Sequence, residues 1–172
     1  MLSTRFSRLK IDHLIKLIGM TEKKMNWKIK SYDALTKDEL FEILKLRVDV
    51  FVVEQACPYP EIDDTDRASE TRHLFLVKDE HILAYARCYR KSATTASIGR
   101  VIVSSMLRGQ GVAHDLMHRA IACCEMDIAH EALVISAQCY LDKFYTGLGF
   151  VKQGEEYLED GIPHQDMLFV KK

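Results

Sequence analysis

Residues 101–117, VIVSSMLRGQGVAHDLM, run from a β-branched apolar stretch through a turn with Arg108, Gly109 and Gly111 into an amphipathic pattern. β-branched residues favour a strand. The apolar positions from Val112 onward recur at the spacing of a helix that covers a sheet. A strand, a turn with free backbone N–H groups and a helix N-terminus together form an anion-binding site. The stretch therefore predicts a strand–turn–helix unit that binds phosphate.

Two common phosphate-binding loops do not match this turn. A P-loop needs G-x-x-x-x-G-K-[ST], which the sequence lacks, and a dinucleotide fingerprint needs glycine where His114 stands. The pattern present is R-x-x-G-x-A, from Arg108 to Ala113. Its glycines allow the backbone to approach a ligand closely, and Arg108 adds a fixed positive charge. By itself the pattern also fits an ordinary strand-to-helix connection.

Composition limits the class of protein. The chain has 172 residues, of which 24 are Lys or Arg and 25 are Asp or Glu, so its formal net charge is −1. This length fits one domain with one core, and the lack of a basic excess argues against a nucleic-acid partner. The five cysteines include no C-x-x-C pair, which indicates a reducing, cytoplasmic compartment. No apolar run approaches the roughly 18 residues of a membrane span, so no membrane partner is expected.

Residues 1–24 differ from the rest of the chain. They are basic and only weakly periodic, and the pattern of a folded domain begins at Met25. We interpret them as a basic N-terminal extension, with a transit peptide over residues 1–9 as the alternative. Residues 25–172 are then a single domain.

The domain alternates between strand and helix patterns. Strands are expected over residues 27–32, 73–77, 82–89, 98–103, 132–136, 150–158 and 165–170. Helices are expected from a capping box at residues 36–39 to Phe51, over 110–129 and over 140–148. The order β-α-βββ-α-β-α-ββ predicts an α/β (α+β) fold with a central mixed, mostly antiparallel sheet flanked by helices. Residues 57–71 are expected to form a long loop, and its acids are Glu61, Asp63, Asp64, Asp66 and Glu70.

The pattern R-x-x-G-x-A after a V-x-V strand, followed by a Phe-Tyr helix and Gly-Phe, resembles the GNAT superfamily of acetyl-CoA-dependent N-acetyltransferases. The resemblance covers residues 27–170. Within it, five stretches are similar to the ElaA-like group of this superfamily: LRVDVFVVEQACPYPEIDDTD, TRHLFLV, GRVIV, SAQCYLDKFYTGLGF and YLEDGIPHQDM. The resemblance implies the GNAT fold, with acetyl-CoA in a cleft between splayed strands. The implied CoA-binding residues are Val101, Ile102 and Val103 for the pantetheine arm and Arg108, Gly109, Gln110, Gly111, Val112 and Ala113 for the pyrophosphate.

Acetyl transfer to an amine needs a neutral amine, a donor for the oxyanion and a proton for the departing thiolate. An alkyl amine with a pKa of about 10.4 costs roughly 4–5 kcal/mol to deprotonate at pH 7, so a base helps. The resemblance implies that Tyr145 protonates the sulfur, the alternative being a core tyrosine. Glu54 is the preferred base, because its apolar neighbours would bury it and raise its pKa. A structural carboxylate is its alternative, and His73 and His164 are other candidates on the acceptor side.

Three functions stay open at this point. The first is an acetyl-CoA-dependent N-acetyltransferase that acts on a primary amine of a small molecule or an exposed protein amine, by direct transfer in a ternary complex. The second is a catalytically silent acyl-CoA-binding sensor. The third is an acyltransferase like the acyl-homoserine lactone synthases, suggested by Arg47 and Phe51 in the first helix.

The expected partners are acetyl-CoA, an amine acceptor and, as a further hypothesis, a second copy of the chain in a homodimer. No metal is expected, because His114 and His118 lie four residues apart without a third ligand at a suitable spacing. The acids of residues 61–66 are expected to attract the cationic amine to the mouth of the cleft.

Overall fold

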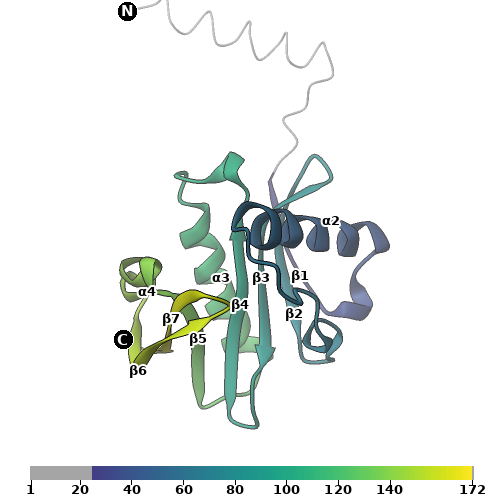
Figure 1. The fold of residues 1–172 in the computed structure, drawn as a ribbon. Helices are drawn as coiled ribbons and strands as arrows, with labels where there is room; N and C mark the ends of the chain where they lie inside the picture. The colour runs from purple at the N-terminus through teal and green to yellow at the C-terminus, as the bar shows by residue number, and fades with distance from the viewer. Residues whose placement is uncertain (1–24, 172) are drawn as a thin grey trace, which may run out of the picture.

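A sheet in the strand order β1-β2-β3-β4-β5-β7-β6 forms the centre of the computed structural model, which describes residues 25–171 (Figure 1). The strands are β1 (Asn26–Lys30), β2 (Arg72–Lys78), β3 (His81–Arg90), β4 (Thr95–Val103), β5 (Ala132–Gln138), β6 (Phe150–Glu159) and β7 (Ile162–Phe169). Only the β4–β5 pair of this sheet is parallel. The predicted fold class and element order are therefore confirmed.

The helices are α2 (Lys37–Arg47), α3 (Val112–Asp127) and α4 (Asp142–Gly147). The capping box of α2 is present: the Glu39 N–H donates to Thr36 Oγ1 at 3.1 Å, and the Thr36 N–H donates to Glu39 Oε2 at 3.0 Å. Each of these bonds gives a backbone N–H group at the start of the helix a side-chain acceptor. The predicted end of this helix is wrong, because the α-helix stops at Arg47 and the chain continues as a π-helical segment, Val48–Glu54.

Both faces of the sheet are covered. Leu74 and Leu76 of β2 belong to a core cluster with the buried side of α3, whereas Phe75 belongs to a second cluster with Ile43 of α2. Alternate residues of a strand point to opposite faces, so α2 and α3 lie on opposite sides of the sheet (Figure 1). The helix predicted over residues 110–129 buries the expected apolar face.

A bulge in β4 lies just beyond the point where this strand separates from β5. Tyr85 of β3 pairs with Ile102 and Arg87 pairs with Gly99, so β4 contains one residue more than β3 over this interval. Arg100 within it has a φ of 54°, and such bulges bend a strand and increase its twist. The β4–β5 pairs extend only to Ser97. The strands then diverge, which leaves residues 101–103 unpaired on the β5 side.

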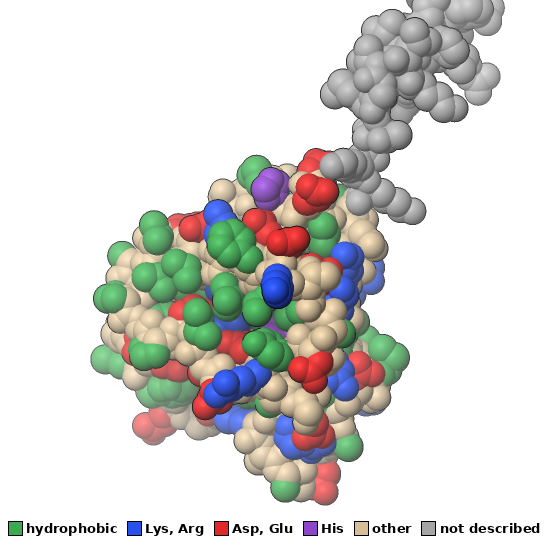
Figure 2. Space-filling view, turned by 90° about the vertical axis from the view of Figure 1, so that its right-hand side faces the viewer, with side chains coloured by type: hydrophobic (Ala, Val, Ile, Leu, Met, Phe, Trp, Pro, Cys, Tyr) green, Lys and Arg blue, Asp and Glu red, His purple; other side chains and the backbone are tan. Residues whose placement is uncertain are grey.

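The prediction for residues 1–24 lies outside the described residues. Within residues 25–171 no helix is long and apolar enough to cross a membrane. On the face shown in Figure 2, acidic and basic side chains are interspersed and do not gather into a large patch of one sign.

Candidate active site

Two cavities adjoin where β4 and β5 separate. The first, the hairpin cavity, has a volume of about 220 Å³ and is lined by residues of β3, β4, β5 and the β6–β7 hairpin. The second, the turn cavity, has a volume of about 430 Å³ and runs along residues 101–103 to Arg108 and Ala113. The residues that line both cavities are Gln55, Val101, Tyr140, Leu141 and Tyr145. A ligand in the turn cavity can therefore meet a second ligand in the hairpin cavity.

The predicted phosphate-binding turn has the conformation that an anion site requires. Gly109 and Gly111 have φ values of 74° and 79°, and Gly111 is the N-cap of α3. Within the described residues, the N–H groups of residues 109–113 donate no hydrogen bond. Such free amides at a helix N-terminus bind anions through their dipoles and hydrogen bonds. The turn thus fits the diphosphate of a CoA thioester.

Arg108 of this turn is engaged by Glu54. Its Nη1 and Nη2 donate to the two Glu54 carboxylate oxygens at 2.7 and 2.9 Å, and its Nε donates to the Val103 carbonyl at 3.0 Å. The Glu54 side chain is 46% exposed. The hydrogen bond and charge of Arg108 lower the pKa of Glu54. The expected buried Glu54 with a raised pKa is therefore wrong, because the π-helical segment directs this carboxylate outward to Arg108.

Tyr145 lies in α4, at the junction of the two cavities. Its ring packs edge-on against Phe144, with centroids 5.0 Å apart, and against Phe150, with centroids 6.0 Å apart. Burial raises the pKa of Tyr145 to about 12. Its hydroxyl consequently stays protonated at neutral pH and can donate a proton or a hydrogen bond.

The two candidate histidines have different surroundings. His73 is buried, with Nδ1 2.8 Å from the Tyr85 hydroxyl and Nε2 2.8 Å from the Asp66 carbonyl oxygen. Both ring nitrogens are engaged and the residue lines neither cavity. Tertiary contacts thus fix His73 inside the protein and away from both cavities, and its role in substrate binding stays a prediction.

His164 lines the hairpin cavity. Its Nδ1 lies 2.8 Å from the Ile162 carbonyl oxygen. Because a carbonyl only accepts, Nδ1 carries the proton in the neutral ring and Nε2 keeps its lone pair. Nε2 has no hydrogen-bond partner among residues 25–171. His164 is thus the histidine of the site with a nitrogen free to accept a proton.

The acids of the long loop are not free. Arg47 donates from Nε to Glu61 Oε1 at 2.5 Å and from Nη1 to Asp66 Oδ1 at 2.6 Å. The other ion pairs join Arg87 to Asp63 and Asp66, and Arg100 to Glu61 and Asp63. Three arginines therefore balance three carboxylates. The expectation that this loop attracts a cationic amine is wrong, because its charges are neutralised within the fold.

The lactone-synthase hypothesis is based on Arg47 and Phe51, and the fold places these two side chains in different surroundings. Arg47 is completely buried among the loop acids and lines neither cavity. Phe51 lines the hairpin cavity.

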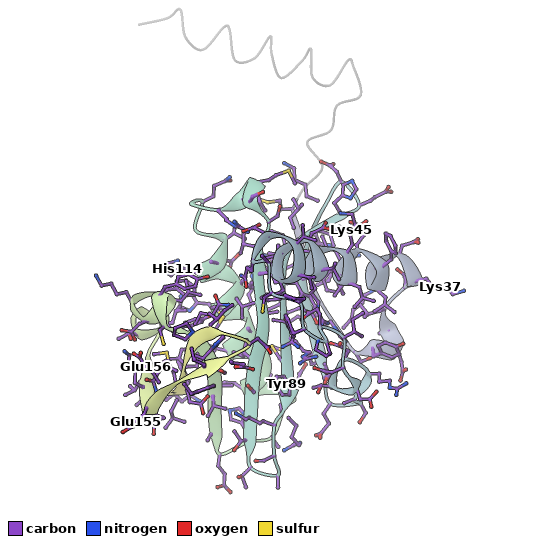
Figure 3. The ribbon with its side chains drawn as sticks, in the orientation of Figure 1. Lys37, Lys45, Tyr89, His114, Glu155 and Glu156 are labelled. Atoms are coloured by element: carbon purple, nitrogen blue, oxygen red, sulfur yellow. The ribbon has the colours of Figure 1, made fainter. Side chains whose placement is uncertain are left out.

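Within residues 25–171 no group of three His, Cys, Asp or Glu side chains is placed to hold a metal ion. His114 packs edge-on against Phe144, with ring centroids 4.9 Å apart (Figure 3).

Several residues that line the site are absent from the sequence-based predictions, among them Tyr140, Lys91, Ser136 and Glu159. Tyr140 is 72% exposed, which is unusual for so large an aromatic side chain. It lies two residues after the end of β5, and residues that follow a strand next to a cleft often carry function. Its position after an apolar strand was therefore a usable signal. Lys91 and Ser136 had none, because their cavity forms only when four strands assemble.

The strands β4 and β5 separate after one parallel pair, beside a helix N-terminus with free amides and a buried tyrosine, and this is the arrangement expected of an acyl-CoA-dependent transferase. The chain belongs to the GNAT acetyltransferase family, whose domain model, "Acetyltransferase (GNAT) domain", matches residues 37–170. The predicted GNAT and ElaA-like resemblance is confirmed by this match and by the relatives described next.

Two relatives cover nearly the whole domain. An acyl-CoA N-acyltransferase from Pseudomonas aeruginosa is 42% identical, with a TM-score of 0.81 over 86% of this chain and 100% of that one. Protein ElaA of Escherichia coli is 38% identical over 145 residues, 83% of this chain and 95% of ElaA. The crystal structure of ElaA gives a TM-score of 0.80 over 84% of this chain and 99% of that one.

A CoA-dependent acyl-homoserine lactone synthase, BjaI, shares the fold with a TM-score of 0.68 at 18% identity, over 86% of this chain and 85% of BjaI. This likeness shows a shared fold alone. The family model and the Pseudomonas aeruginosa relative, an acyl-CoA N-acyltransferase, define the class of this chain as a GNAT acyltransferase.

Proposed function

We propose that the protein transfers an acetyl group from acetyl-CoA to a primary amine by direct transfer in a ternary complex. The observation that carries this proposal is the position of Tyr145 at the junction of the turn cavity and the hairpin cavity. One cavity reaches the phosphate-binding turn, and the other is open to a small acceptor. When both substrates are bound in this way, the thioester and the amine lie next to each other at Tyr145. This joint binding converts a bimolecular reaction into an effectively unimolecular one.

Each residue type then has a separate task. The amide groups of residues 109–113 hold the diphosphate, and the unpaired edge of residues 101–103 holds the pantetheine arm. A backbone N–H of the same edge donates to the oxyanion that forms when the amine nitrogen attacks the thioester carbonyl carbon. When the carbon–sulfur bond breaks, the Tyr145 hydroxyl supplies the proton for the thiolate.

The proton that the amine loses needs an acceptor, and His164 fits this role better than Glu54. Glu54 is paired with Arg108 and has a lowered pKa, so it is a weak base. His164 lines the hairpin cavity with Nε2 free, and an imidazole nitrogen with a free lone pair can accept a proton. We assign the base to His164, directly or through one water. The cytoplasmic compartment and the homodimer stay predictions.

The test measures free thiol released from acetyl-CoA in the presence of primary amines, for the wild-type protein and for Tyr145→Phe. The substitution removes only the hydroxyl. Turnover should fall by roughly 10²- to 10⁴-fold, as expected for a lost proton donor, while acetyl-CoA affinity by isothermal titration stays within a few-fold. Wild-type protein that binds acetyl-CoA but releases no thiol with any amine would instead be an acyl-CoA sensor.

A further inference from the structure

The hairpin cavity carries charges of both signs on different structural elements. Lys91 follows β3, whereas Glu159 and Asp160 lie at the turn of the β6–β7 hairpin. Arg100 also lines this cavity, but its charge is paired with the buried Glu61 carboxylate at 2.7 Å. The charges that remain for a ligand are therefore one cation on the β3 side and two carboxylates on the hairpin side.

A side chain of β5, which lies beyond β7 in the sheet, contacts Glu159 of β6 and holds it in place. The Ser136 hydroxyl of β5 donates to Glu159 Oε2 at 3.1 Å and also contacts the Tyr157 hydroxyl at 2.5 Å. Tyr157 in turn stacks on the ring of His164, with centroids 6.2 Å apart. This arrangement orients the Glu159 carboxylate and the proposed base on the same hairpin. An ammonium group bound by Glu159 is thus placed beside the group that removes its proton.

Lys91 has no ion-pair or hydrogen-bond partner for its ammonium group among residues 25–171. Its neighbour Arg90, by contrast, is paired with Glu70 at 2.6 Å. A free cation lining one side of the cavity favours a negatively charged group on the ligand. The cavity volume of about 220 Å³ is below the roughly 300–1,000 Å³ of pockets for drug-sized ligands. The site therefore fits a small molecule.

We propose that the acceptor is a small zwitterion that carries one primary amine and one carboxylate, with the ammonium on Glu159 and the carboxylate on Lys91. The inference rests on the proposed amine acetylation and specifies its substrate class. Before transfer, the ammonium loses one proton to His164. Its nitrogen then attacks the thioester carbonyl carbon, the carbon–sulfur bond breaks and the thiolate takes the Tyr145 proton, while the second proton that the nitrogen loses restores the Tyr145 hydroxyl. The carboxylate of the acceptor is not changed in the reaction. A diamine of the same length places a second cation against Lys91, and like charges at short range disfavour binding.

The experiment compares three acceptors of equal chain length: 5-aminopentanoate, pentylamine and 1,5-diaminopentane, together with the shorter members of each series. With acetyl-CoA and wild-type protein, the amino acid series should give a kcat/KM at least tenfold above the matched amines, and the diamines should be the poorest acceptors. In Lys91→Glu the order of amino acid and diamine should reverse. Glu159→Gln should raise KM about tenfold or more for every acceptor, because a hydrogen-bonded charge partner of the ammonium is lost.

Lys37→Glu is the matched control, because it makes the same change of charge at an exposed site on α2, away from both cavities (Figure 3). It should leave the order of acceptors unchanged. If amines are acetylated but Lys91→Glu changes the order no more than Lys37→Glu does, the zwitterion assignment is wrong and the acetyltransferase proposal stands. If acetyl-CoA binds and no acceptor of any series releases thiol, both proposals are wrong.

Discussion

Asp66 is the carboxylate that two buried arginines share, so replacing it with asparagine tests whether the loop acids are structural. Its side chain is 7% exposed. Oδ1 accepts from Arg47 Nη1 at 2.6 Å and from Arg87 Nη1 at 2.8 Å, and Oδ2 accepts from Arg47 Nη2 at 3.2 Å. Asp66→Asn keeps the shape of the side chain but leaves three guanidinium groups against two carboxylates.

The expected destabilisation follows from this burial. Removing one partner from a buried ion pair costs about 3–5 kcal/mol, because the other charge stays desolvated. Since a domain has a total stability of about 5–15 kcal/mol, this loss is a large fraction of it. For a chain of this length 1 kcal/mol corresponds to about 2–4 °C in Tm, so Tm should fall by roughly 6–20 °C. Calorimetry or urea unfolding measures the difference.

The pH dependence gives a second readout. Burial alone raises the pKa of Asp66, but the hydrogen bonds and charges of Arg47 and Arg87 lower it below its usual value of 3.8. A carboxyl whose pKa is lowered by folding stabilises the fold fully above its unfolded pKa and loses this contribution as the pH falls through the folded pKa. The stability difference between wild type and Asp66→Asn should stay constant from pH 7 to about pH 5 and shrink below about pH 4.

Asp64→Asn is the matched control in the same loop. Its side chain is 88% exposed and, among residues 25–171, pairs only with Arg67, itself 68% exposed. Exposed pairs contribute little to stability, so this variant should unfold close to the wild-type temperature. Equal Tm values for Asp64→Asn and Asp66→Asn would refute this reasoning, because they would mean that Asp66 stabilises the fold no more than an exposed carboxylate does.

Three further predictions concern the site. Gly111→Asp should abolish acetyl-CoA binding in isothermal titration, whereas Gly111→Asn should keep most of it. Both side chains tolerate the left-handed φ of 79°, and a Cβ there meets no atom within 4 Å, so the two variants differ in the negative charge alone. Equal affinities of the two variants would mean that the diphosphate does not bind at this turn. Glu54→Gln should tighten acetyl-CoA binding by up to about fivefold, since it frees Arg108 from an exposed ion pair; weaker binding would mean that Glu54 positions Arg108. Because the pKa of Tyr145 is raised to about 12, the rate should show no loss from tyrosine ionisation as the pH rises to about 10. A fall of the rate as the pH rises toward 10 would contradict its role as the acid.

Periodic patterns made most of the fold predictable. The alternation around Leu74 and Phe75 and the helical spacing from Val112 onward are local features, and they identified β2 and α3. The capping box at Thr36 located the start of α2. These signals depend on residues within one element, so one sequence contains them. The change from α-helix to π-helix after Arg47 has no such local marker.

The environment of Glu54 shows why the base could not be predicted from its neighbours. In the stretch FVVEQ the residues adjacent in sequence are apolar, but successive residues of a helical segment point in different directions. Val53 is 69% exposed beside it, so the apolar neighbours do not bury the carboxylate. Its partner Arg108 lies 54 residues away in sequence. A contact at that separation is set by the assembled sheet and is absent from any local pattern.

The three arginines that pair with the loop acids explain why the cleft opens at a fixed place. Arg47 comes from α2, Arg87 from β3 and Arg100 from the bulge of β4, and all three contact acids of one loop. The φ of 54° at Arg100 costs a non-glycine residue about 1–2 kcal/mol. Its pairing with Glu61 at 2.7 Å and its position over the Tyr59 ring, 5.4 Å from the centroid, offset this strain. Because the bulge lies just beyond the last pair of β4 and β5, the loop acids stabilise the shape of the cleft, and the charges that select the acceptor must come from other elements.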